Sequence, residues 1–192
     1  MLPEPIAVTL TVTSILENLN IPYFIGGSLA STLHGIIRTT QDSDIVADIQ
    51  PDQIATLLAE LGNEFYIDEE MIAESVSRKS SFNILHRETM FKVDIFVPEM
   101  KPFNRSQFMR AQQQAFSREL AEKAFVASAE DTILMKLDWY RMGGGLSERQ
   151  WRDVVGILKV QGERLDLDYL RQWAQELNVS DLLERALSDS IA

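Results

Sequence analysis

Residues 24–49, FIGGSLASTLHGIIRTTQDSDIVADI, place two apolar, strand-like runs on either side of a short helical stretch. The first run breaks at Gly26, Gly27 and Ser28, and the second begins with Asp42 and Asp44, one residue apart. Short apolar runs bounded by proline or glycine are typical of buried strands. The segment therefore predicts a strand, a tight turn, a short helix and a second strand, which restricts the chain to folds that mix helices with a sheet.

The remaining periodicity supports the same class of fold. Helical spacing covers residues 6–19 and 51–62, strands are expected at 22–26, 43–49, 82–86 and 90–98, and residues 63–81 are ambiguous. The last two strands are separated by a polar turn and should pair antiparallel. After them the chain becomes helical, with capping-box patterns at Ser128 and Ser147. We expect an α+β (mixed α/β) fold: a small mixed sheet with flanking helices, followed by a helical C-terminal region.

Two domains are expected from this change of character. Residues 1–115 would form a core with about four strands, and residues 116–192 would form a helical region packed on that core. No proline- or serine-rich linker separates the two parts.

Composition excludes several kinds of chemistry. The 192 residues contain no cysteine, which excludes disulfides, thiol catalysis and cysteine-ligated metals. No basic leader precedes an apolar segment and no membrane-length apolar run occurs, so we expect a cytoplasmic protein with no membrane partner. The net charge of -11 weighs against broad nucleic-acid binding. It is compatible with a nucleotide whose phosphates are neutralised by a cation.

The turn at Gly26, Gly27 and Ser28 has two interpretations. Small residues at the start of a helix expose backbone N–H groups to a phosphate, and the Ser28 hydroxyl can add a hydrogen bond. An ordinary tight turn, in which glycine supplies a positive φ, explains the same residues. The turn by itself does not decide between them.

Three aspartates could share one face of the sheet. Asp42 and Asp44 lie two apart on an expected strand and so point the same way. On the strand at 90–98, Lys92, Asp94 and Phe96 share a face. If the two strands are neighbours, Asp94 joins the other two in a three-carboxylate site for Mg²⁺. The alternative is that all three are solvated.

The combination resembles the polymerase-beta-like nucleotidyltransferase superfamily, whose pattern is a Gly-Gly/Ser turn, a D-x-D strand and a further strand aspartate. It is most similar to the small bacterial branch of minimal and abortive-infection toxin nucleotidyltransferases. Arg-x-Thr/Ser-x-Asp-x-Asp is typical there, and this chain has the order Arg38, Thr39, Thr40, Gln41, Asp42, Ser43, Asp44. The resemblance covers about residues 24–97 and is vaguer afterwards.

The resemblance implies a role for each motif residue. Asp42, Asp44 and Asp94 would be catalytic and hold one or two Mg²⁺ ions, with Asp94 also helping to deprotonate an acceptor hydroxyl. Nucleotide binding would fall to a further set of residues: Gly26, Gly27, Ser28, Arg38 and Lys136.

Lys136, Asp153 and His34 each have two competing explanations. Lys136 and Asp153 match the order of a lysine and an aspartate in the toxin-like relatives. Lys136 could equally run along the edge of its helix, and Asp153 could form a salt bridge with Lys136 or Arg149. His34 lies beside the expected site and could touch the nucleotide or serve in packing at the end of its helix.

The resemblance implies a metal-dependent transfer of NMP from an NTP to a hydroxyl acceptor, with release of pyrophosphate. The acceptor would be RNA, a protein or a small molecule. The alternative is a non-catalytic binding or regulatory partner with the same fold, for example in a toxin–antitoxin pair. A glycosyltransferase that uses D-x-D is a third possibility, against which the short chain and the early glycine turn both speak.

Overall fold

The computed structural model of the chain describes residues 3–36, 40, 42–116 and 122–191. The chain divides into two compact units. The first comprises Met1–Ser28 with Thr40–Val126, and the second Leu29–Thr39 with Ala127–Ala192.

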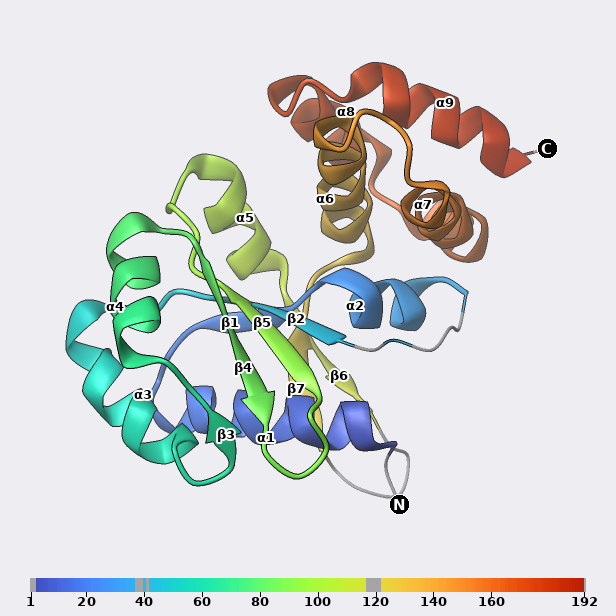
Figure 1. The fold of residues 1–192 in the computed structure, drawn as a ribbon. Helices are drawn as coiled ribbons and strands as arrows, with labels where there is room; N and C mark the ends of the chain where they lie inside the picture. Colours follow the sequence, from blue (N-terminus) through green and yellow to red (C-terminus); the bar gives the residue numbers. More distant parts are fainter. Residues whose placement is uncertain (1–2, 37–39, 41, 117–121, 192) are drawn as a thin grey trace. The chain divides into compact units, whose positions relative to one another are not determined.

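Seven strands of the described chain form one mixed sheet in the first unit, in the order β3-β4-β5-β2-β1-β7-β6 (Figure 1). They are β1 (Tyr23–Ile25), β2 (Asp42–Ala47), β3 (Phe65–Tyr66), β4 (Ser81–His86), β5 (Lys92–Phe96), β6 (Gln112–Ala115) and β7 (Lys123–Val126). The central strand β2 pairs antiparallel with β1 and parallel with β5. β4 and β5 pair antiparallel, as their sequence predicts.

The helices that accompany the sheet in the first unit follow from their end signals. They are α1 (Glu4–Asn18), the 3-10 turn η1 (Pro51–Gln53), α3 (Ile54–Leu61), α4 (Glu69–Arg78) and α5 (Pro102–Arg110). α4 begins where the Asp68 carboxylate accepts a hydrogen bond from the Met71 N–H, and it ends at Lys79, which has a positive φ. α3 packs against α1 and α4, and α4 packs against β4 (Figure 1).

The second unit is helical. It contains α6 (Ala129–Met142), α7 (Glu148–Gln161), the 3-10 turn η2 (Gly162–Arg164), α8 (Leu167–Glu176) and α9 (Ser180–Ile191). The hydroxyls of Ser128 and Ser147 accept the N–H groups of Asp131 and Gln150, so both expected caps are present. α6 packs against α7 and α8, and α9 packs against both of these (Figure 1). Helix α2 (Gly27–His34) begins in the first unit and continues in the second.

The expected class of fold, a mixed sheet with flanking helices and a helical C-terminal region, is confirmed. The sheet is larger than expected, because β3, β6 and β7 add to the strands that the sequence pattern predicts. The ambiguous residues 63–81 contain β3 and α4. The domain division after residue 115 stays a prediction.

Candidate functional site

Two aspartates face each other across neighbouring strands. In the parallel pair of β2 and β5, Asp44 lies opposite Asp94, and Asp42 lies opposite Lys92. Neighbouring strands are about 4.8 Å apart, and residues in register point to the same face. Ser43, between the two aspartates of β2, is buried on the other face with 0% exposure. We call the three aspartates Asp42, Asp44 and Asp94 the carboxylate face.

Gly27 brings the start of α2 against this face. The Gly26 N–H donates to the Asp44 carbonyl at 2.9 Å, which fixes the turn to β2. Gly27 has a φ of +52°, and a β-carbon built on it would overlap the carboxyl group of Asp44 and lie 2.7 Å from the Asp44 β-carbon. Only glycine satisfies both conditions. Ser28 follows as a buried residue of the first turn of α2.

Thr40 orients the first aspartate. Its hydroxyl lies 2.8 Å from the Asp42 carbonyl oxygen and 3.2 Å from Asp42 Oδ1. A hydroxyl that bonds the residue two positions on is a common local device before a strand. Arg38, the expected nucleotide-binding residue just before it, lies outside the described residues.

A lysine lies within the carboxylate face. Lys92 Nζ contacts Asp94 Oδ2 at 2.6 Å, with side chains that are 42% and 19% exposed respectively. The hydrogen bond to Asp94 raises the pKa of the Lys92 ammonium, and the negative charges of all three aspartates raise it further. Burial acts in the opposite direction. The alternation of the strand predicts that Lys92 shares this face with Asp94, two residues away. The sequence does not indicate that the two side chains form an ion pair.

The sequence pattern does not indicate Asn83 as a residue of the candidate site. On β4 it lies opposite Asp94, on the side away from β2. Its side chain therefore shares the face of Asp94, and an amide oxygen is a ligand type that hard divalent cations accept. Only knowledge that β4 neighbours β5 in this register could have identified it.

The carboxylate face fits a divalent cation by donor chemistry and strand register. Oxygen ligands suit Mg²⁺, and Asp94 and Asp44 are opposite each other. Yet the described residues contain no group of three or more His, Cys, Asp or Glu side chains arranged to hold a metal ion. The ammonium of Lys92 already engages Asp94. The three-carboxylate metal site stays a prediction.

The second unit contains a buried ion pair. Lys136 on α6 and Asp153 on α7 are 2.8 Å apart, with side chains only 5% and 9% exposed. The salt bridge considered for Asp153 is therefore present. It ties α6 to α7, and a nucleotide-binding role for Lys136 stays a prediction.

His34 packs at the end of α2 within the same unit. Its Nε2 lies 2.7 Å from the Ala127 carbonyl oxygen, so the neutral tautomer that carries a proton on Nε2 donates this hydrogen bond. Burial lowers the pKa of His34; the Ala127 hydrogen bond and the charge of Glu130 oppose that effect. This contact matches the packing explanation at the helix end.

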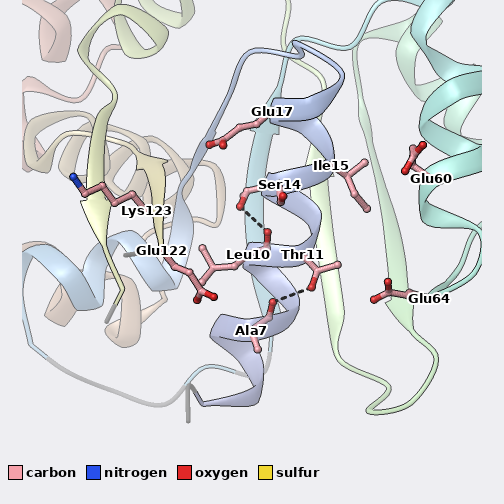
Figure 2. Close-up of a pocket in the computed structure, with 11 residues that line it drawn as sticks. Ala7, Leu10, Thr11, Ser14, Ile15, Glu17, Glu60, Glu64, Glu122 and Lys123 are labelled. Atoms are coloured by element: carbon pink, nitrogen blue, oxygen red, sulfur yellow. Dashed lines mark hydrogen bonds between the residues drawn. The ribbon is translucent and has the colours of Figure 1, made fainter. Parts of the chain in front are cut away.

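A separate cavity of about 700 Å³ lies along α1. Figure 2 shows Glu60 and Glu64 on one side of α1 and Glu122 and Lys123 on the other. None of the predicted site residues lines it. The chemistry that the sequence predicts belongs to the carboxylate face, and this cavity contributes nothing to it.

Comparison with known proteins identifies the class of fold. No protein-family model matches the chain. No curated protein matches it either. Among solved structures, the chain is similar to an antigenic nucleotidyltransferase-like protein from Paracoccidioides brasiliensis, with 18% identity and a TM-score of 0.57 over 98% of this chain and 94% of that one.

Two structures of the antibiotic-resistance factor ANT(2'')-Ia are also similar. A solution structure has 14% identity and a TM-score of 0.54 over 95% of this chain and 97% of that one. A crystal structure in complex with adenylyl-2''-tobramycin has 12% identity and a TM-score of 0.54 over 89% and 97%. At such identities the likeness shows the fold, and the chain has the fold of these nucleotidyltransferases. No helix among the described residues combines the length and apolar character needed to cross a membrane.

Proposed function

We propose that this chain is a metal-dependent nucleotidyltransferase that moves NMP from an NTP to a hydroxyl acceptor and releases pyrophosphate. The observation that carries the proposal is the register that sets Asp44 opposite Asp94, with Asp42 on the same face. The glycine turn at Gly27 lies directly against Asp44. A phosphate-binding turn and hard oxygen ligands thus adjoin each other, as the transfer requires.

In this proposal the aspartates bind the metal and the glycine turn binds phosphate. Asp42, Asp44 and Asp94 would hold one or two Mg²⁺ ions, which neutralise phosphate charge and polarise the α-phosphate when bound. Backbone N–H groups at Gly27 and Ser28 bind phosphate oxygens at the positive end of α2. Asp94 accepts the proton of the acceptor hydroxyl while the oxygen of that hydroxyl forms a bond to the α-phosphorus. The bond from that phosphorus to the bridging oxygen breaks, and pyrophosphate leaves.

A small-molecule acceptor is the variant that we favour. The net charge of -11 opposes a long polyanionic acceptor. The similar protein ANT(2'')-Ia has been solved with adenylyl-2''-tobramycin, in which an adenylyl group is joined to a small molecule. Membership of the toxin-like branch and a toxin–antitoxin partner both stay predictions.

Thermal unfolding with Mg²⁺ and each of the four NTPs tests the proposal. A ligand that binds only the folded chain raises the melting temperature, so at least one NTP should do so. The double variant Asp42→Asn/Asp44→Asn should lose this shift, whereas Asp52→Asn, an exposed carboxylate in η1, should keep it. No shift with any NTP would contradict the proposal and favour the non-catalytic partner.

A further inference from the structure

Lys92 occupies a defined place among the three aspartates. It lies opposite Asp42 in the register of β2 and β5, and two residues before Asp94 on its own strand. All four residues therefore share one face of two neighbouring strands. This placement is set by backbone pairing and does not depend on the conformation of a loop.

The ion pair engages one of the two carboxylate oxygens of Asp94. Lys92 Nζ contacts Asp94 Oδ2 at 2.6 Å, and the side chain of Asp94 is 19% exposed. An ammonium at this distance competes with a divalent cation for the Asp94 carboxylate, because the two positive charges repel each other. A lysine ammonium is charged at neutral pH.

We propose that Lys92 is a positioning residue: its ammonium is the counter-ion of the carboxylate face in the metal-free chain and leaves Asp94 when a divalent cation binds. This rests on the proposed function, because it assumes that the cation binds these aspartates. The long, flexible stem of lysine allows its head group to move while the strand holds Asp94 in place.

The exchange has a cost that can be measured as affinity. Binding of the cation must break the ion pair, and the released positive charge stays near the cation and repels it. Removing the lysine charge should therefore tighten binding. A lysine with only a packing role would change stability without changing the response to the metal.

The experiment is a titration of the full chain with Mn²⁺, with free Mn²⁺ followed by its electron paramagnetic resonance signal. For Lys92→Met and Lys92→Gln, the account expects a Kd about tenfold lower than for the wild type, which corresponds to about 1.4 kcal/mol. Lys92→Arg keeps the charge and should stay within about twofold of the wild type. Lys101→Met is a matched control, because Lys101 forms a 2.7 Å pair with Glu99, likewise two residues away; it should leave the Kd unchanged.

Thermal unfolding of the same proteins supplies a second measurement. Lys92→Met should melt at a lower temperature than the wild type without metal, because the aspartates then repel one another. It should gain a larger increase than the wild type when Mg²⁺ is added. Two variants are used so that the test still works when Lys92→Met does not fold. Lys92→Gln retains a polar head group on the same strand.

The outcomes separate this proposal from the proposed function. Mn²⁺ that binds the wild type and Lys92→Met with the same Kd, and is lost in Asp44→Asn, would overturn the role of Lys92 and leave the metal site intact. No binding to either the wild type or the Lys92 variants would overturn both. Tighter binding in Lys92→Met and Lys92→Gln, but not in Lys101→Met, supports the exchange.

Discussion

The carboxyl group of Asp44 lies against the α-carbon of Gly27, in the space that a β-carbon would fill. The contact joins the first residue of α2 to β2, and the hydrogen bond from the Gly26 N–H to the Asp44 carbonyl reinforces it. One glycine thus holds the turn that we propose to bind phosphate against an aspartate that we propose to bind metal.

Gly27→Ala should disrupt this contact. The left-handed backbone at φ +52° alone costs an alanine about 1–2 kcal/mol, and the new methyl group must also displace Asp44. We expect a loss of at least that much unfolding free energy in urea, together with loss of the Mg²⁺-NTP thermal shift. Gly26→Ala is the control for the loss of unfolding free energy, because a β-carbon built on Gly26 has no atom within 4 Å. Equal effects of the two variants would contradict the account.

Ser43→Ala should leave stability unchanged or raise it. Ser43 lies between two aspartates of β2, is 0% exposed, and its hydroxyl has no hydrogen-bond partner among the described residues. A buried hydroxyl without a partner costs about 1–3 kcal/mol. Chemical denaturation of the variant measures the change, and a clear loss of stability would show that the hydroxyl makes a favourable interaction.

Lys136→Met should destabilise the second unit strongly. Lys136 and Asp153 form a pair with side chains 5% and 9% exposed, and removing one partner of a buried pair costs about 3–5 kcal/mol. The double variant Lys136→Met/Asp153→Leu should recover much of this loss, because neither charge is then buried alone. The single variant Asp153→Leu completes the set. If the losses of unfolding free energy in Lys136→Met and Asp153→Leu, measured in urea, add up to the loss in the double variant, the pair is not coupled.

Protonation of His34 should reduce stability in mildly acidic solution. Burial lowers its pKa from the usual 6.5, so the folded state favours the neutral ring. The stability that this contributes is fully present above pH 6.5 and is lost as the pH falls through that value toward the lowered pKa. The unfolding free energy measured between about pH 7.5 and pH 5 should fall less steeply in His34→Gln. Identical slopes would refute the assignment.

The sequence predicts the strands that carry the site because their signals are local. Apolar alternation around Asp44 and Asp94 defines β2 and β5, and the Ser128 capping pattern marks the start of α6. Each of these features depends on residues that are close along the chain. The sequence places Asp94 beside Asp42 and Asp44 only if β2 and β5 are neighbouring strands. The structure shows that these two strands pair.

The parts that the sequence does not predict depend on contacts between distant segments. β6 consists of the residues QQQA and has no apolar alternation, so only its pairing with β7 makes it a strand. β3 has two residues, too few for any periodicity. The ion pair of Lys92 with Asp94 and the place of Asn83 opposite Asp94 follow from side-chain conformation and register, which spacing alone does not determine.

The most direct test of the central claim, transfer of NMP by the carboxylate face, is label transfer from NTPs. The protein is incubated with Mg²⁺, cell extract and each NTP, labelled either on the α- or on the γ-phosphate. The account predicts that α-label joins a component of the extract while γ-label leaves as pyrophosphate, and that Asp44→Asn shows neither. Transfer of γ-label, or no transfer from any NTP by the folded wild type, would contradict it.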